Sequence, residues 1–311
     1  MTGTGRRALV TGGAGFVGSH LVDRLLADGY RVGVIDDLST GSTSNVSPQA
    51  EFHRVDICDA TPLHDVALRF RPEVVFHAAA QTDVRRSTRE PDFDARVNVV
   101  GGLNVLRAAA AAGARRIVYA SSAAVYGNPT RVPVTETEPT RPISEYGASK
   151  LAFEHYLGAY AARGLIEYAA LRYANVYGPR QRSEGEAGVV SIFTRQMIAG
   201  EPVTIFGDGS KTRDYVYVSD VVEATVRAAA GPPGGGVVAN VGWGREVSDL
   251  ELFRAVADAT GYAKQPTFAA DRRGDVARSC LDAGVAQRTW GWRPSVSVPD
   301  GVRRVVEHAR K

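Results

Sequence analysis

Tyr146 and Lys150 are the side chains of this sequence best suited to chemistry. They lie four residues apart in YGASK, at the start of a predicted helix, and this spacing puts both on one helix face. A free tyrosine titrates near pH ~10 and is a poor base at neutral pH. A neighbouring ammonium group favours the phenolate, lowers the pKa of the phenol, and so suits it to taking a proton from a hydroxyl group.

Neighbouring motifs decide whether this pair has a function, because a tyrosine and a lysine at this spacing are more often a solvated pair without a role. Ser122 in SSAAVYG follows a predicted strand, at the end where open parallel sheets bind their ligands. Its hydroxyl can bridge a substrate oxygen and Tyr146. We therefore expect Ser122, Tyr146 and Lys150 to act together in proton transfer.

A glycine-rich turn directly follows the first predicted strand. In TGGAGFVGSH, Gly12, Gly15 and Gly18 have the spacing GxxGxxG, and Gly13 with the last two also fits GxGxxG. Such glycines permit a turn with positive φ, let the backbone touch a pyrophosphate, and bring helix close to strand. Asp36 ends the second predicted strand, where an acidic side chain accepts hydrogen bonds from ribose hydroxyls and repels a 2′-phosphate. The cofactor NAD is therefore favoured over NADP, and its positive nicotinamide ring is expected to favour the Tyr146 phenolate together with the ammonium group of Lys150.

These groups need a framework that brings them together, and the first half of the chain predicts one. Apolar runs indicate strands at Arg7–Thr11, Arg31–Asp36, Glu51–Arg54, Val74–His77, Arg116–Ser121 and Tyr168–Leu171, and helical patterns lie at Phe16–Asp28, Pro62–Phe70, Phe93–Ala112 and Tyr146–Arg163. Strands that alternate with helices imply a parallel sheet covered on both faces. The predicted fold class is α/β, a doubly wound parallel sheet (Rossmann) with a smaller α/β substrate-binding C-terminal domain.

The pattern changes after Arg172. Residues 175–188 are rich in glycine, proline and charge and are predicted to form a long loop near a site. Further elements are expected at Val189–Ala199, Val203–Phe206, Tyr215–Val218, Val221–Ala230 and Gly236–Val241, the last of which can rejoin the main sheet. We predict an NAD-binding Rossmann domain over 1–174 plus about 219–243, and a second domain over 175–218 and 244–311.

Composition excludes several classes of function. The net charge of +3 is small for 311 residues and the basic residues are scattered, which disfavours nucleic-acid binding. Cys58 and Cys280 are too few for a zinc site or a disulfide framework, and His20 and His77 are expected to pack or hydrogen-bond, so no metal is predicted. Because no apolar stretch suits a signal peptide or a membrane span, no membrane partner and a cytoplasmic location are expected.

Ten short motifs carry a resemblance to a known family. In order they are TGGAGFVGSH, DDLSTG, VDICD, HAAAQTDV, NVVGGLNVL, SSAAVYG, YGASK, RYANVYGPRQ, FGDGSKTRDYVYVSD and RRGDV. Together they resemble the extended short-chain dehydrogenases/reductases of the NAD-dependent sugar epimerase/dehydratase family, from Arg7 to the C-terminus. The resemblance implies catalysis by Tyr146, Lys150 and Ser122. It implies NAD contacts at Gly12, Gly15, Phe16, Val17, Gly18, Asp36, Asp37, Ser39, Thr40, Gly41, Asp56, Ile57, Ala78, Ala79, Thr82, Asn98, Tyr146, Lys150 and Tyr173.

The residues after Ser122 narrow the reaction. Related 4,6-dehydratases carry an Asp-Glu pair there, and decarboxylases carry a Glu at the second position, whereas this chain has Ala123 and Ala124. Methyl groups cannot transfer protons, so dehydration and decarboxylation are disfavoured. The resemblance then implies an isomerase, a nucleotide-sugar 4-epimerase. Tyr146, helped by Ser122, would take the proton of the carbon-4 hydroxyl while hydride passes to nicotinamide, and the 4-keto sugar would rotate and be reduced on its other face.

A UDP-sugar is the substrate that the resemblance implies. The family motifs place substrate contacts at Thr82, Ser122, Ala123, Tyr146, Asn175, Arg182, Val190, Thr204, Phe206, Arg213, Arg272, Asp275 and Ser279. Arginine suits a diphosphate by its charge and fork geometry.

The identity of the sugar stays open. Interconversion of UDP-glucose and UDP-galactose is the first choice by family breadth. UDP-glucuronate is a close second because Arg182 aligns with an arginine that faces a carbon-6 carboxylate. Ser279 aligns with a gate residue and is small, which leaves room for N-acetylhexosamines.

Two further classes of protein are alternatives, a keto-sugar reductase and a non-catalytic NAD-binding protein. Asp36 and the uridine motifs argue against the first, and the retained Tyr–Lys pair argues against the second. Family members commonly form homodimers through a four-helix bundle, for which Phe93–Ala112 and Tyr146–Arg163 are the candidate helices.

Overall fold

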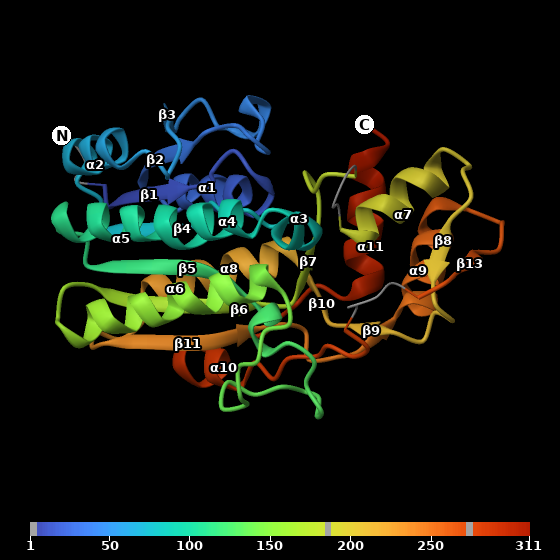
Figure 1. The fold of residues 1–311 in the computed structure, drawn as a ribbon. Helices are drawn as coiled ribbons and strands as arrows, with labels where there is room; N and C mark the ends of the chain where they lie inside the picture. Colours follow the sequence, from blue (N-terminus) through green and yellow to red (C-terminus); the bar gives the residue numbers. More distant parts are fainter. Residues whose placement is uncertain (1–4, 184–187, 272–275) are drawn as a thin grey trace.

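A seven-stranded parallel sheet forms the centre of the protein (Figure 1). The computed structural model describes residues 5–183, 188–271 and 276–311. The strands lie in the order β3-β2-β1-β4-β5-β6-β11, and each pair of neighbours is parallel. Their bounds are β1 Arg7–Thr11, β2 Arg31–Asp36, β3 Glu51–Arg54, β4 Val74–His77, β5 Arg116–Ser122, β6 Glu167–Tyr173 and β11 Gly236–Val241. The predicted doubly wound fold is confirmed.

Helices cover both faces of this sheet. On one face, α1 (Phe16–Ala27) packs against α8 (Val218–Ala229); on the other, α2 (Ala60–Phe70) packs against α5 (Gly102–Ala111), which in turn contacts α6 (Glu145–Ala162). Each face has its own apolar core, one including Leu21 and Leu25 of α1 and the other including Phe153 and Leu157 of α6. The near-continuous apolar strands follow from burial on both faces.

Side-chain caps place two of the predicted catalytic groups. The Ser144 hydroxyl accepts a hydrogen bond from the backbone N–H of Gly147 and caps α6, so Tyr146 lies in the first helical turn. Ser122 ends β5 and caps the 3₁₀ turn Ala123–Tyr126 by accepting from the N–H of Ala124 at 3.1 Å. The chain therefore turns sharply at the carboxyl edge of the sheet, next to the start of α6.

The helix predicted at Phe93–Ala112 is present without a break, but its middle is a π-helical turn. Pro91 opens a short helix α4 (Pro91–Ala95), which leads through a π-helical turn (Arg96–Gly101) into α5, and a short helix α3 (Val84–Arg89) that the sequence did not predict precedes them. The apolar periodicity runs unbroken through the π-turn, so it gave no sign of the change. Such turns are frequent at functional sites.

The predicted loop 175–188 begins with a strand. β7 (Asn175–Tyr177) pairs in parallel with β10 (Tyr215–Tyr217). Three residues followed by Gly-Pro are too short a pattern to distinguish a strand from a loop. After β7, the chain enters the part of the molecule that lies beyond the carboxyl edge of the main sheet.

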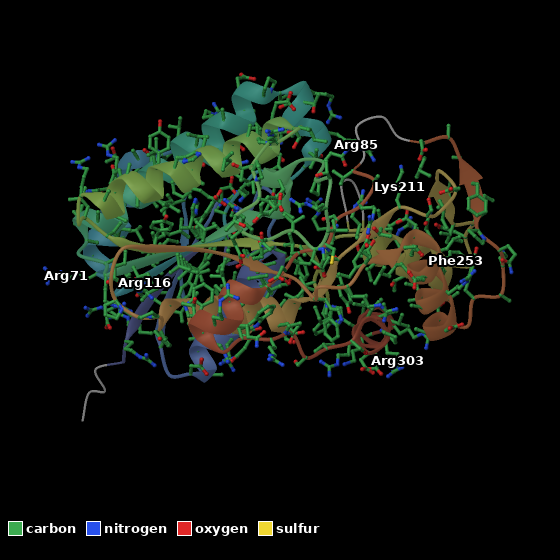
Figure 2. The ribbon with its side chains drawn as sticks, turned by 90° about the horizontal axis from the view of Figure 1, so that it is seen from below. Arg71, Arg85, Arg116, Lys211, Phe253 and Arg303 are labelled. Atoms are coloured by element: carbon green, nitrogen blue, oxygen red, sulfur yellow. The ribbon has the colours of Figure 1, made fainter. Side chains whose placement is uncertain are left out.

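A smaller lobe completes the molecule on that side (Figure 1). Its elements are α7 Val189–Ile198, β8 Thr204–Phe206, β9 Thr212–Arg213, β12 Val247–Ser248, α9 Asp249–Thr260, β13 Thr267–Ala269 and α11 Val298–Ala309, and α10 (Gly284–Trp290) returns to pack against β11 and α8. Figure 2 places Arg71 and Arg116 at one end of the molecule and Lys211 and Phe253 at the other. Because Arg116 begins β5, the strands run from the first end toward the smaller lobe.

Three structural observations bear on the other expectations. The described helices include none that is long and apolar enough to cross a membrane. Within the same residues, no group of three or more His, Cys, Asp or Glu could hold a metal ion. β11 joins the main sheet beside β6, while the domain boundaries themselves stay a prediction.

Trp292 supplies a test of how the C-terminal segment is held. Its indole is 1% exposed and donates a hydrogen bond to the Asp220 carbonyl at 2.9 Å. We expect Trp292→Ala to lower the free energy of unfolding by about 3–5 kcal/mol, because it removes both the buried ring and the bond. Phe268→Ala, which truncates a ring that is 56% exposed, should change it by less than about 0.5 kcal/mol. Thermal or urea unfolding measures both, and equal effects would contradict the prediction.

Candidate active site

A cleft of about 980 Å³ opens at the carboxyl edge of the sheet. Gly12 contributes to its lining directly after β1, and residues 78–83 contribute directly after β4. β1 and β4 are neighbours from which the chain proceeds in opposite directions across the sheet, so the cleft lies at the topological switch point. Ligands of doubly wound sheets bind at this point.

The three motif glycines fulfil three different steric demands. Gly12 has φ +72°, and a Cβ there would lie 2.6 Å from the backbone nitrogen of Ala79. Gly18 lies so close to the carbonyl oxygen of Gly12 that α1 could not approach β1 with a side chain between them. Gly15, in contrast, has φ −81°, lines the cleft, and would place a Cβ near only one atom, the Gly12 oxygen at 3.2 Å. A side chain at Gly15 would therefore occupy the cleft itself.

Asp36 lies on the floor of the same cleft at the end of β2. Its carboxylate accepts hydrogen bonds from the backbone N–H groups of Ala14, at 3.0 Å, and Leu38, at 2.8 Å. Burial raises the pKa of this carboxyl group, and the two N–H groups oppose that rise. The side chain is thus fixed against the glycine-rich turn, with a carboxylate in position for ribose hydroxyls.

Most of the residues predicted to contact the cofactor line this one cleft. They are Gly12, Gly15, Phe16, Val17, Gly18, Asp36, Asp37, Ser39, Thr40, Gly41, Asp56, Ile57, Ala78, Ala79 and Thr82. They come from loops that follow β1, β2, β3 and β4. The sequence did not single out several other lining residues, among them Gln81, Arg86, Arg180 and Gln181. Gln81 belongs to the motif HAAAQTDV, Arg86 follows that motif, and Arg180 and Gln181 belong to YGPRQ, so these motifs could have indicated them.

Four of the predicted cofactor residues lie outside the lining of the cleft: Asn98, Tyr146, Lys150 and Tyr173. Asn98, in the π-turn, is buried; its amide nitrogen donates to the Ser149 hydroxyl at 3.1 Å and its amide oxygen accepts from the N–H of Gln81 at 2.9 Å. The Tyr173 hydroxyl hydrogen-bonds with that of Thr225 at 2.7 Å. Asn98 thus links the wall of the cleft to α6, and the contact of these four residues with the cofactor stays a prediction.

The structure brings Ser122, Tyr146 and Lys150 together between β5 and α6. The Ser122 hydroxyl lies close enough to the Tyr146 phenol to lower the pKa of that phenol. The Lys150 ammonium donates to the Ala120 carbonyl at 2.8 Å and lies 5.8 Å from the centre of the Tyr146 ring. All three groups therefore meet at the last residues of β5, where the sequence predicted a proton-transfer site.

The protein's own groups shift both pKa values of the pair. Burial raises the pKa of Tyr146 to about 12, the nearby Ser122 hydroxyl lowers it, and the charge of Asp94 raises it further. Burial also lowers the pKa of Lys150 to about 8, against the charges of Asp94 and Glu154. Lys150 alone therefore does not lower the phenol pKa, and the lowering expected from its ammonium group together with a nicotinamide ring stays a prediction.

The predicted substrate residues fall into three places. Thr82 and Arg182 line the cleft, and Ala123 follows Ser122 in the 3₁₀ turn. Asn175, Arg213 and Ser279 lie on neighbouring segments: Asn175 N–H donates to the Asp214 carbonyl at 2.9 Å, and Ser279 N–H donates to the Thr212 carbonyl at 3.2 Å.

The remaining substrate residues belong to the smaller lobe. Val190 is buried in α7, and Thr204 and Phe206 begin and end β8, which pairs with β13. The Thr204 hydroxyl hydrogen-bonds with that of Thr267 at 2.9 Å. Arg272 and Asp275 lie outside the described residues. The second and third groups thus come from elements that sequence spacing could not relate to one another.

Sheet order, glycine turn and the Ser–Tyr–Lys group together define a short-chain dehydrogenase/reductase type of protein. The sequence pattern of the "NAD dependent epimerase/dehydratase family" matches residues 8–242, and the chain belongs to this family. It is 49% identical over 310 residues to a UDP-glucose 4-epimerase of Mycolicibacterium smegmatis, covering 98% of each chain.

Solved structures agree with this assignment. The UDP-glucose 4-epimerase of Thermotoga maritima, determined with UDP-glucose, superposes with a TM-score of 0.95 at 44% identity and 98% coverage of each chain. The UDP-glucose 4-epimerase of Thermus thermophilus, determined with NAD, has a TM-score of 0.91 at 45% identity, with 98% of this chain and 99% of the other covered.

The cleft fits NAD on its own chemistry. The glycine turn offers backbone at the position where a Cβ of Gly15 would intrude, and the amino end of α1 follows it at Phe16. Helix amino ends favour phosphate, and the carboxylate of Asp36 suits free ribose hydroxyls while it disfavours a phosphate there. The chain therefore holds the donor and acceptor groups that a dinucleotide with an unmodified ribose requires.

Gly15 provides the sharpest test of that fit. Gly15→Ala should fold normally, because the backbone conformation suits any residue, yet weaken NAD binding about tenfold or more (~1.4 kcal/mol) by filling space in the cleft. NAD retained after purification and its dissociation constant would measure this. Gly158→Ala is the matched control, since a Cβ at Gly158 would meet only the Tyr168 hydroxyl at 3.7 Å. Unchanged NAD binding by Gly15→Ala would argue against dinucleotide binding at this turn.

Proposed function

We propose that this protein is an NAD-dependent UDP-sugar 4-epimerase, an isomerase that interconverts UDP-glucose and UDP-galactose. The observation that carries the proposal is the meeting of Ser122, Tyr146 and Lys150 at the carboxyl edge of the sheet, beside a cleft that fits NAD. Relatives at 44% to 49% identity over nearly the whole chain bear the name UDP-glucose 4-epimerase, which supports the same reaction and the same sugar.

The chain's own residues would handle the proton of the carbon-4 hydroxyl. Tyr146 accepts this proton, and Ser122, which lies beside the phenol, holds the sugar oxygen in line. Lys150 supplies positive charge beside the pair, fixed through the Ala120 carbonyl. NAD, when bound, supplies the group that accepts and returns hydride at carbon 4. Once the 4-keto sugar has turned, hydride returned to the opposite face of carbon 4 would invert the centre, and Tyr146 would give its proton back to the carbon-4 oxygen.

The neighbours of Ser122 support epimerisation over elimination. Ala123 and Ala124 form the start of the 3₁₀ turn that follows the serine. No acid or base comes from those two positions, so nothing there can remove a proton from carbon 5 or protonate a leaving hydroxyl. Transient oxidation at carbon 4 needs neither group. It requires only that the diphosphate be held while the sugar turns.

We assign that grip to the second set of substrate residues. Asn175 and Arg213 lie on neighbouring segments, because the N–H of Asn175 donates to the carbonyl of Asp214. Arginine is suited to bind a diphosphate. Val190, Thr204 and Phe206 would enclose the uridine, and Arg272 and Asp275 complete the proposed set. The smaller lobe, 175–218 with 244–311, is proposed as the nucleotide-sugar-binding domain.

A second substrate is favoured by the position of Arg182. This exposed arginine lines the cleft, so its guanidinium group can meet a carboxylate on carbon 6 of the sugar. UDP-glucuronate is therefore the alternative substrate. Ser279 is small and half-buried, which leaves UDP-N-acetylhexosamines as a third possibility for the same catalytic group.

Assembly and location are proposed on narrower grounds. Val100, 50% exposed, and Tyr156, 41% exposed, lie on the π-turn and on α6, which contact each other on one face of the sheet. Exposed apolar groups on these helices support the expected homodimer. Cys58 and Cys280 are both free thiols, which supports a reducing, cytoplasmic location.

Tyr146→Phe tests the reaction. We expect kcat for the conversion of UDP-galactose to fall about 10²- to 10⁴-fold while NAD stays bound, because only the proton acceptor is removed. Tyr156→Phe, on the exposed side of the same helix, should leave kcat unchanged. Chromatographic separation of UDP-glucose from UDP-galactose provides the measurement. Failure of the wild-type protein to convert UDP-galactose, UDP-glucuronate or UDP-N-acetylglucosamine would overturn the proposed function.

Arg182→Ala separates the candidate sugars. If UDP-glucuronate is the substrate, kcat/KM for it should fall about ten- to hundredfold and that for UDP-galactose should not change, since the lost contact is with a carboxylate. Arg195→Ala, which removes an exposed arginine of α7 paired with Glu201 at 3.1 Å, serves as the control. Unaltered ratios of the two kcat/KM values would exclude Arg182 from sugar selection.

A further inference from the structure

A buried ion pair lies directly behind the candidate active site. Glu154, on α6, and Arg172, on β6, form two hydrogen bonds, Nη2 to Oε2 at 2.6 Å and Nε to Oε1 at 3.0 Å. Both side chains are buried. Burying a charge pair is weak evidence for stability, because desolvation offsets the attraction between the two charges. The pair therefore calls for an explanation beyond stability.

The pair is tied to the residues on both sides of Ser122. The Ser121 hydroxyl donates to Glu154 at 2.5 Å, and the Arg172 Nη1 donates to the Tyr126 hydroxyl at 2.8 Å. Ser121 precedes Ser122 in β5, and Tyr126 ends the 3₁₀ turn that Ser122 caps. Two hydrogen bonds thus fix the chain just before and just after the proposed catalytic serine.

Glu154 extends the same control to α6. It lies four residues after Lys150 and eight after Tyr146, so all three side chains share one face of the helix. They face three consecutive residues of β5: Lys150 donates a hydrogen bond to the carbonyl of residue 120, Glu154 accepts one from the hydroxyl of residue 121, and Tyr146 lies beside the hydroxyl of residue 122.

A row of neighbouring strand residues completes the network. Ser121, Arg172 and Asn240 are direct neighbours across β5, β6 and β11. The Tyr126 hydroxyl donates to the Asn240 side chain at 2.8 Å, and that side chain donates to the carbonyls of Val134 at 2.8 Å and of residue 282 at 3.0 Å. The segment after the proposed gate residue Ser279 is thereby joined to the same network.

We propose that Glu154 and Arg172 are positioning residues, which hold Ser122 at working distance from Tyr146 through Ser121 and Tyr126. This inference rests on the proposed function of the three catalytic groups. Both side chains are buried and bonded to Ser121 and Tyr126, so both would act through other residues. In a fully hydrogen-bonded buried network, loss of one member shifts the others. A displacement of Ser122 by about 1 Å would slow the chemical step up to about a hundredfold.

Two conservative variants test the proposal, each with a matched control. Ser121→Ala is compared with Ser295→Ala, since Ser295 likewise donates a hydroxyl hydrogen bond, at 2.7 Å, to a buried carboxylate, that of Asp220. Tyr126→Phe is compared with Tyr177→Phe, which also removes a buried phenol hydroxyl. We expect the two network variants to lower kcat about tenfold or more, with KM within about twofold of the wild type. The controls, which remove hydroxyl hydrogen bonds outside this network, should leave kcat unchanged.

Glu154→Gln removes the charge of the carboxylate and should lower kcat further. Because it leaves Arg172 unpaired, it can also unfold the protein, so the test is decided by Ser121→Ala and Tyr126→Phe.

Amide hydrogen exchange at residues 122–126 and 146–150 gives a second readout that needs no turnover. Faster exchange there in Ser121→Ala than in Ser295→Ala would support the proposal. Unchanged kcat and exchange in both network variants would overturn it. If the wild-type protein has no epimerase activity, the proposed function is overturned instead. The comparison of amide exchange between the network variants and their controls would then still test the positioning role.

Discussion

The packing of one helix across the end of one strand is the constraint on which the rest of the structure depends. Tyr146, Lys150 and Glu154 recur every four residues along α6, and each faces one of the three last residues of β5. Because successive turns of one helix meet adjacent residues of one strand, these contacts fix the place where α6 crosses β5. Gly147 allows the close approach, because a Cβ there would lie 2.5 Å from the Ala124 oxygen. A shift of α6 by one residue would separate all three contacts at once.

The cofactor cleft depends on the same helix through a second buried cluster. Gln81, in the wall of the cleft, donates from its side chain to Asp94 at 2.9 Å, and Asn98 joins both residues to Ser149, the neighbour of Lys150. The π-turn inserts an extra residue into the helix that carries Asn98. One carboxylate oxygen of Asp94 has no hydrogen-bond partner among the described residues, so its charge stays available to act on Lys150. The wall of the cleft and the catalytic group are therefore parts of one rigid arrangement.

The sequence predicted the parts that local rules determine. Five strands, β1 to β4 and β11, have the predicted bounds. All but β3 are short, largely apolar runs between turn residues. The glycine turn and the Tyr–Lys pair were also readable, because close residues in sequence carry the chemistry in both. The Glu154–Arg172 pair was not, for it depends on α6 crossing β6 and on the register of Ser121 with Arg172. Asn98 illustrates the same limit: its motif was recognised, whereas its place behind the cleft follows from the π-turn.

The protonation of Tyr146 links these parts into one argument about the reaction. The protein alone holds the phenol neutral, since burial raises its pKa to about 12. Lys150 cannot reverse this by itself: burial lowers its own pKa to about 8, and its ammonium group is directed to the Ala120 carbonyl. Further positive charge beside the phenol is required before Tyr146 can act as a base. A cationic nicotinamide ring bound beside Tyr146 would provide that charge, and the base would then be formed only in the complex with the cofactor. An enzyme built in this way keeps its tyrosine protonated, and so inert, until the cofactor is in place.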